Sequence, residues 1–187
     1  MGKKGLAIGH KAPDFELEST KGTIRLDQYA GKPLLLLFIR GTWCPNCRRQ
    51  LEALQTACTR FDKLGVPIVI IAGQKLQNLM QYADSTNMPL PLLSDSTREV
   101  IKAYEVFTPI KWDSFRIAVP SAYLLDKEQV IRYAYIGSSQ FDRPGVEELL
   151  EEVQRLIAEP YQAPSISRKN GSSKRRSCCY GRLFVLK

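Results

Sequence analysis

Residues 34–47 read LLLLFIRGTWCPNC, and the expected fold of the chain follows from their pattern. Its first six residues form an uninterrupted apolar run, which is typical of a central strand in a sheet covered by helices on both faces. After the two cysteines, apolar residues recur in steps of four and three, which traces one face of a helix. They are Cys47, Leu51, Leu54, Cys58 and Phe61. The pattern predicts a strand that passes directly into a helix, with both cysteines at the junction.

A second apolar run, residues 68–72, follows soon after Gly65, which is a suitable helix terminator. Residues 34–72 therefore form a predicted strand–helix–strand unit, whose strands should run parallel with a right-handed crossover. The remaining patterns predict a short edge strand at 22–26, helices at 76–83 and 97–104, a hairpin of residues 121–125 and 130–136, and a last helix beginning near Pro144. This order is the layout of an α/β, thioredoxin-like fold, with a central mixed sheet flanked by helices.

Charge is distributed unevenly along the 187 residues, whose formal net charge is +8. Residues 160–187 hold seven of the 27 Lys and Arg residues and no acidic residue, which leaves a net charge of +1 for residues 1–159. We therefore expect one domain, 1–159, and a basic, disordered tail, 160–187, rich in Ser, Lys and Arg. Because the tail sets the basic pI, the charge does not indicate a specific nucleic-acid partner. No apolar run is long enough for a transmembrane segment or a secretory signal, so we expect a cytoplasmic protein.

The two cysteines at the predicted helix start carry the expected chemistry. A helix N-terminus presents unpaired N–H groups and a partial positive charge, both of which favour a thiolate. Cys47 falls on the inward stripe of the helix, whereas Cys44 is expected at its exposed tip. We therefore predict Cys44 as the nucleophile that attacks a disulfide or peroxide, and Cys47 as the resolving thiol that closes a disulfide with it. Arg40 and Arg48 are expected to favour the thiolate further.

A zinc site is the structural alternative for this CxxC pair. It would require two more ligands, and residues 1–159 offer only Cys58 and His10. Cys58 is better explained as a core residue on the helix stripe, and His10 as a solvated side chain, so we expect no metal. The five cysteines also include Cys178 and Cys179 in the basic tail, where acylation or metal capture is conceivable but a solvated tail without function is the simpler interpretation.

Several segments resemble the peroxiredoxin-like branch of the thioredoxin superfamily, the alkyl hydroperoxide reductase and thiol-specific antioxidant proteins. They are residues 9–15 (GHKAPDF), 31–33 (GKP), 92–95 (LLSD) with 103–106 (AYEV), and 121–127 (SAYLLDK). Each is a weak signal, but their order and spacing extend the resemblance over nearly all of residues 8–158. The resemblance implies an antioxidant thiol oxidoreductase.

Two departures from the family pattern concern the mechanism. Peroxiredoxins place a Thr three residues before the reactive Cys, where this chain has Gly41, and Thr42 comes one place later. They also carry an Arg at the start of the late strand, where this chain has Pro120, and Arg116 is off register. Pro120 instead resembles the cis-proline that lies beside the CxxC pair of thioredoxins.

The segment from Trp43 to Cys47 likewise looks more like a thioredoxin site than a peroxiredoxin site, with Trp43 as a lid over the dithiol. We assign substrate binding to Arg40, Thr42, Trp43 and Pro120.

Three functions remain open from the sequence. The first is thiol–disulfide exchange on protein disulfides, and the second is a thiol peroxidase that reduces hydroperoxides. The third is a binding module that keeps the fold without turnover. Because no flavin or nicotinamide fingerprint is present, we expect no cofactor, and reducing equivalents would come from a thioredoxin-type protein or a small thiol.

Overall fold

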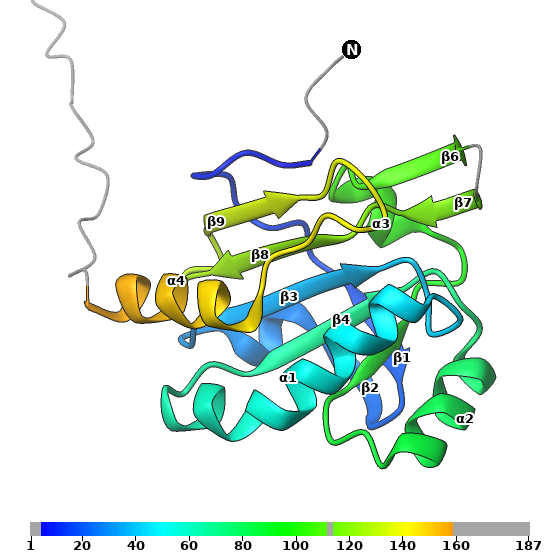
Figure 1. Ribbon diagram of the computed structural model, residues 1–187. Coiled ribbons are helices and arrows are strands. Elements are labelled where there is room, and N and C mark those ends of the chain that lie inside the picture. The colour runs from blue at the N-terminus through cyan, green and yellow to red at the C-terminus, as the bar shows by residue number, and fades with distance from the viewer. Residues whose placement is uncertain (1–4, 112–113, 159–187) are drawn as a thin grey trace, which may run out of the picture.

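The computed structural model describes residues 5–111 and 114–158. Within them, a seven-stranded sheet has the order β2-β1-β5-β4-β3-β8-β9, and β6 and β7 form a separate two-stranded hairpin (Figure 1). The strands are β1 (Glu16–Ser19), β2 (Gly22–Arg25), β3 (Leu34–Ile39), β4 (Ile68–Ala72), β5 (Leu92–Ser94), β6 (Phe107–Lys111), β7 (Ser114–Ala118), β8 (Ser121–Leu125) and β9 (Ile131–Ile136). The helices are a 3₁₀ turn η1 (Leu26–Tyr29), α1 (Pro45–Lys63), α2 (Leu76–Thr86), α3 (Glu99–Ala103) and α4 (Val146–Ala158).

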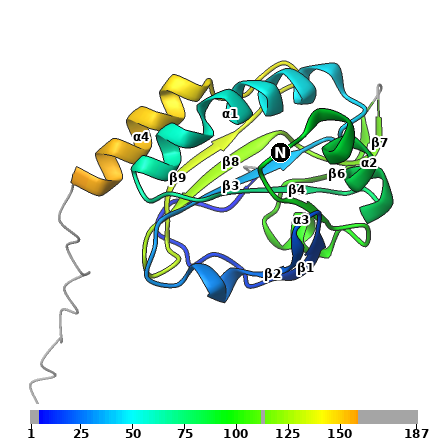
Figure 2. The same cartoon turned by 90° about the horizontal axis from the view of Figure 1, so that it is seen from below.

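The sheet is mixed, and β3 lies near its middle. β3 pairs in parallel with β4 and antiparallel with β8, while β8 and β9 form the predicted antiparallel hairpin. The β3–α1–β4 unit confirms the predicted strand–helix–strand segment, and β2 is an edge strand as expected. Helices α1, α2 and α4 cover one face of the sheet, and α3 with η1 lies on the other (Figure 2). The thioredoxin-like α/β fold expected from the sequence is therefore confirmed.

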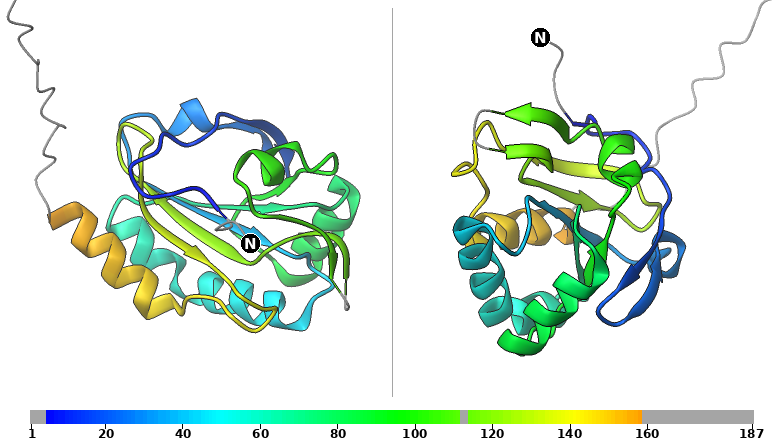
Figure 3. Two further views of the ribbon diagram at one scale, coloured as in Figure 1. Left: turned by 90° about the horizontal axis from the view of Figure 1, so that it is seen from above. Right: turned by 90° about the vertical axis from the view of Figure 1, so that its right-hand side faces the viewer.

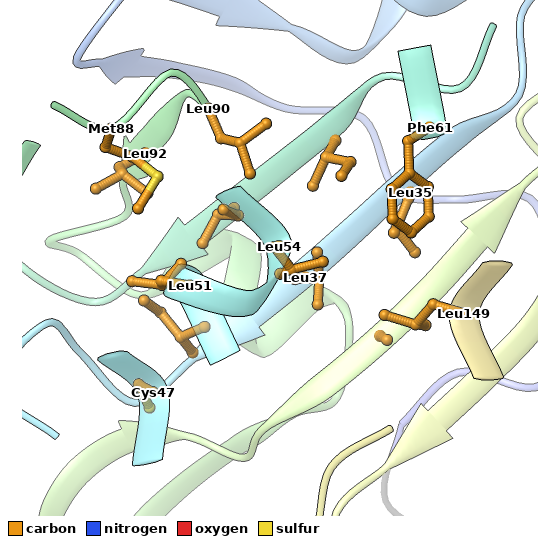
Figure 4. Packing of buried hydrophobic residues seen from close by; sticks show 14 of the residues in the cluster. Leu35, Leu37, Cys47, Leu51, Leu54, Phe61, Met88, Leu90, Leu92 and Leu149 are labelled. Atoms are coloured by element: carbon orange, nitrogen blue, oxygen red, sulfur yellow. The ribbon is translucent and has the colours of Figure 1, made fainter. Parts of the chain in front are cut away.

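Both faces of β3 are buried, as its continuous apolar run predicts. Alternate residues Leu35, Leu37 and Ile39 belong to the core beneath α1 and α4, while the others face an aromatic cluster on the α3 side. In that cluster, the ring centroids of Phe38 and Tyr104 lie 5.0 Å apart. Figure 4 shows the first core, where Leu54 of α1 lies over Leu37, and Phe61 over Leu35. Because both faces of β3 are buried and α1 packs on one of them, the junction between the end of β3 and the start of α1 is held in place.

Some elements differ from the sequence expectation. On α1, Ala57 is buried, whereas Cys58 is half-buried and packs against the edge of the same core. The strands β1 and β5 have only four and three residues, too few for a periodic pattern, and the hairpin β6–β7 was not predicted either. That hairpin lies at the end of the molecule where β3 leads into α1 (Figures 1 and 3).

The predicted basic tail, residues 160–187 with Cys178 and Cys179, lies outside the described residues. Among the helices that are described, none has the length and apolar character needed to cross a membrane.

The contact of α1 with the sheet should dominate stability. Phe61 is fully buried on α1, and Phe61→Ala should lower the free energy of unfolding by about 3–5 kcal/mol, because it removes apolar contacts and leaves a cavity. Thr59→Ala, on the exposed face of the same helix, should change it by less than about 0.5 kcal/mol. Urea unfolding followed by circular dichroism measures both. Equal effects of the two substitutions would contradict this view of the core.

Candidate active site

The two cysteines lie where β3 gives way to α1. Cys44 is the N-cap residue of α1, with extended backbone (φ −82°, ψ 120°), and Pro45 occupies the first turn, where its missing N–H costs nothing. The carbonyl of Cys44 accepts the first helical hydrogen bond from the Arg48 N–H, at 3.0 Å. Cys47 lies one turn further on, on the inward face of α1. The sequence prediction for this junction is confirmed in its backbone geometry.

The prediction of an exposed Cys44 is wrong. Its side chain is only 1% exposed, because the N-terminus of α1 packs against the end of the sheet. Cys44 belongs to the same buried cluster as Cys47. Both residues are free thiols in the structure. The neighbouring Trp43 is exposed, at 49%.

Opposing effects act on the pKa of Cys44. Burial alone would raise it, but hydrogen bonding from the backbone and thiol of Cys47 and from the backbone of Asn46, together with the positive charge of Arg40, outweighs burial. The net effect lowers the pKa of Cys44. Both amide groups belong to the first turn of α1, whose N–H groups have no helical partner and are available to a sulfur.

The pKa of Cys47 is shifted the other way. Burial raises it most, and the charge and thiol of Cys44 raise it further. The Gly41 backbone N–H and the Arg143 guanidinium lower it, without reversing the outcome. The two thiols are therefore electrostatically different, and the thiolate is favoured on Cys44.

Arg40 and Trp43 lie together beside the dithiol. Arg40 is 4% exposed, its Cζ lies 5.4 Å from the centroid of the Trp43 ring, and its guanidinium donates a hydrogen bond to the Gln140 side chain. Arg48 lies one turn after Cys44 as expected, but its Nε donates to the Thr42 carbonyl at 2.5 Å. Arg40 is thus the arginine whose charge lowers the pKa of Cys44.

Thr42 is buried and held by the loop after β4. Its N–H donates to Oε1 of Gln74 at 2.7 Å, and Nε2 of Gln74 donates to its hydroxyl at 3.3 Å. Gln74 comes two residues after the carboxyl end of β4, which lies beside that of β3 because the two strands are parallel. Gln74 was not predicted from the sequence, although polar residues just after neighbouring parallel strands are a usable signal.

The prediction of a cis peptide bond at Pro120 is wrong, since every described peptide bond is trans. Pro120 is buried one residue before β8, and Ser121 pairs with Phe38, so the proline does lie beside the end of β3. Its carbonyl accepts a hydrogen bond from the Gly137 N–H at 2.9 Å. Only Val119 and Pro120 separate β7 from β8, and a trans proline is compatible with the start of a strand.

Three further polar side chains near the dithiol were missed by the sequence analysis. Gln140 and Arg143 come from the loop between β9 and α4, and Tyr82 comes from α2. Burial of the phenol raises the pKa of Tyr82 most, the charge of Glu52 raises it next, and the charge of Cys47 adds to the rise. Nothing in the local sequence marks these residues, because each reaches the dithiol through the tertiary fold.

The described residues contain no group of three or more His, Cys, Asp and Glu side chains that could hold a metal ion. A hollow of about 980 Å³ is lined by residues that include Pro33, Asp126 and Leu156. It adjoins the start of β3 and the end of α4, at the opposite end of the sheet from Cys44, and it takes no part in the dithiol site.

Comparisons with known proteins agree with this site. A thiol-disulfide oxidoreductase, ResA, of Geobacillus kaustophilus is 28% identical over 154 residues, 81% of each chain. A 1-Cys peroxiredoxin, PER1, of Hordeum vulgare is 25% identical over 162 residues, 82% of this chain and 74% of the relative. The crystal structure of a mutant peroxiredoxin 6 of Arenicola marina superposes with a TM-score of 0.74 at 16% identity, over 82% of this chain and 74% of that one, which shows the shared fold.

The model of the AhpC/TSA family matches residues 8–134, more than half of the sequence and including both cysteines of the site. With a thioredoxin-like fold, a buried dithiol and thiol-redox relatives, this chain belongs to the AhpC/TSA family and is a thiol-dependent oxidoreductase.

Proposed function

We propose that the protein reduces disulfides by thiol–disulfide exchange, with Cys44 as the nucleophile and Cys47 as the resolving thiol. The observation that carries this proposal is the asymmetry of the pair at the N-terminus of α1. The lowered pKa of Cys44 supports its role as attacking thiolate, and the raised pKa of Cys47 suits a thiol that stays protonated until the first step is complete.

The proposed cycle has two exchange steps. The Cys44 thiolate attacks one sulfur of a substrate disulfide, forms a mixed disulfide and releases the other substrate sulfur as a thiolate. Cys47 loses its proton and attacks the Cys44 sulfur, which closes the Cys44–Cys47 bond and releases the second substrate thiolate. The substrate gains two electrons, and a thioredoxin-type protein or a small thiol returns them to the dithiol.

The surroundings of Gly41 support disulfide exchange over peroxide reduction. Gly41 has φ +153°, and a Cβ there would collide with the Trp43 indole nitrogen and lie 2.9 Å from Oε1 of Gln74. The position where peroxiredoxins carry a Thr side chain is therefore filled by Trp43. Pro120 stands where those proteins carry an Arg, so two groups that would act on a peroxide are replaced by apolar ones.

The burial of Cys44 favours a second candidate, a thiol peroxidase. A sulfur that is 1% exposed is more accessible to a small hydroperoxide than to a protein disulfide, and Arg40 supplies a buried positive charge beside it. Reduction would convert the hydroperoxide to an alcohol and Cys44 to a sulfenic acid. Cys47 would then condense with it to the same disulfide and release water. For disulfide exchange with a protein, the Cys44 sulfur must become more exposed than it is in this structure.

Cysteine replacements test the roles of the pair. Cys44→Ser should reduce turnover to background, because the nucleophile is lost, whereas Cys47→Ser should accumulate a mixed disulfide with the substrate. Insulin reduction without peroxide measures exchange, and NADPH consumption that depends on a hydroperoxide, in an assay coupled to thioredoxin and its reductase, measures the peroxidase. Cys58→Ser is the control and should retain turnover. Full activity of Cys44→Ser would exclude both candidates.

The reactivity of Cys44 should persist below the pH at which ordinary thiols lose it. A free cysteine with a pKa of about 8.5 loses more than about tenfold of its thiolate between pH 9 and pH 7. Because the pKa of Cys44 is lowered, its alkylation by iodoacetamide should fall by less over this range, and Cys47 should react last. Quenched time courses read by peptide mass spectrometry give both rates. A Cys44 profile like that of glutathione would contradict the proposed thiolate.

Gly41→Ala should disturb the site directly. The added Cβ forces Trp43 away and strains a backbone with positive φ, at a cost of about 1–3 kcal/mol in the free energy of unfolding. Gly145→Ala is the matched control, since a Cβ there meets nothing within 4 Å. Denaturant unfolding and tryptophan fluorescence measure the two effects. An unchanged emission spectrum for Gly41→Ala would show that Trp43 does not occupy this position.

A further inference from the structure

We propose that Arg143 stabilises the thiolate of Cys47, the sulfur that leaves when the Cys44–Cys47 disulfide is reduced. This inference rests on the dithiol cycle proposed above and assigns a positioned cation to its second thiol. The guanidinium of Arg40 would then stabilise the thiolate of Cys44, and the guanidinium of Arg143 the thiolate of Cys47.

The loop between β9 and α4 holds Arg143 in a fixed place. The Asp142 carboxylate accepts hydrogen bonds from the Ser138 N–H and hydroxyl, each 2.6 Å long, and a third from the Tyr135 hydroxyl. These bonds lower the pKa of Asp142 to about 2, so the loop keeps its anchor throughout the neutral range. Gly137 begins the loop, and a Cβ there would collide with the Asp142 carbonyl, which shows how tightly the loop is folded.

The same loop joins the two arginines. Nη2 of Arg143 donates to the backbone carbonyl of Gln140, and the side chain of Gln140 accepts from Arg40. One residue therefore anchors both guanidinium groups, the first beside Cys44 and the second beside Cys47. This connection sets Arg143 at the dithiol from an element that is about a hundred residues away along the chain.

Arg143 keeps unused hydrogen-bond donors at this place. Its Nε and Nη1 are buried and have no hydrogen-bond partner among the residues that the structure describes, while the guanidinium lies close enough to the Cys47 sulfur to lower the pKa of that thiol. A buried guanidinium with unpaired donors is costly unless it meets an anion. In the dithiol form Cys47 is a neutral thiol, so the anion that completes the site is formed only during the cycle.

Reduction of the Cys44–Cys47 disulfide produces the Cys47 thiolate, which can accept hydrogen bonds from the unpaired donors of Arg143. When a donor thiolate attacks the Cys44 sulfur of the disulfide, a new S–S bond forms and the Cys44–Cys47 bond breaks. The electron pair of the broken bond remains on Cys47, which leaves as a thiolate. Exchange is faster when the leaving thiol is more acidic, so a guanidinium that stabilises the Cys47 thiolate accelerates this step. The same stabilisation helps Cys47 to ionise before it attacks in the opposite direction.

Other groups that face Cys47 must be considered with Arg143. Cys44 at the N-cap of α1 and the backbone N–H of Gly41 act on Cys47 directly, and the charge of Cys47 acts on Tyr82 of α2. Arg48 acts on Tyr82, and Arg40 acts on Cys44. The negative charge of Cys44 opposes ionisation of Cys47, and Arg48 is engaged with the Thr42 carbonyl and lies over the Tyr82 ring. A test of Arg143 therefore removes the charge of Cys44 first.

The test is the titration of Cys47 in full-length Cys44→Ser protein, with and without Arg143→Gln, followed by thiolate absorbance near 240 nm. The pKa of Cys47 should be higher when Arg143 is replaced. In the protein with both cysteines, Arg143→Gln should slow reduction of the oxidised form by dithiothreitol by roughly three- to tenfold at neutral pH. Arg60→Gln is the matched control and should change neither quantity, because Arg60 forms an exposed ion pair with Glu147 on the outer surface.

Arg143→Lys separates electrostatics from loop structure. It keeps the charge without the planar fork, so it should recover part of the lost rate. A Lys variant as slow as the Gln variant, or a Cys47 titration that is the same with and without Arg143, would overturn the inference. These failures are distinct from failure of the dithiol cycle itself, which would appear as absence of a Cys44–Cys47 bond after mild oxidation of the unmodified protein.

Discussion

The first turn of α1, held against the carboxyl end of β3, is the constraint on which the dithiol depends. β3 is buried on both faces, so it cannot slide or turn without exposing one of two cores. α1 packs its inward stripe on the same strand, which sets the helix N-terminus within a few residues of the strand end. The unpaired N–H groups of that turn then act on the sulfur of Cys44.

Burial and charge compete at this site. Transferring a thiolate out of water is unfavourable, and burial raises the pKa of both cysteines. At Cys44 the helix N-terminus, the Cys47 thiol and Arg40 outweigh that cost, whereas at Cys47 the nearby Cys44 charge adds to it. A pair that lies one turn apart on a single helix thus acquires two different acidities, because the two sulfurs stand at different depths and face different donors.

The site combines features of two groups of relatives. The body of the chain matches the AhpC/TSA family, while the segment between β3 and α1 carries a CxxC pair with an adjoining tryptophan. Gly41 stands where peroxiredoxins carry a Thr, and the Trp43 indole occupies the space that a side chain at this position would fill. The indole in turn contacts Arg40. A change at one position therefore alters the packing of several groups around the dithiol, which is why the choice between disulfide and peroxide substrates depends on more than the cysteines.

The sequence alone specified the β3–α1–β4 unit, the β8–β9 hairpin and the position of the cysteines at a helix start. Those features depend on local periodicity and on the continuous apolar run of β3, which neighbouring residues are enough to specify. It could not determine that Cys44 is buried, that Pro120 is trans, or that the buried position on α1 falls on Ala57 and not on Cys58. Gln74, Tyr82, Gln140 and Arg143 were also beyond its reach. These points depend on tertiary contacts, because burial and electrostatics are set by the segments that meet in space, and the loop before α4 is about a hundred residues from Arg40 along the chain.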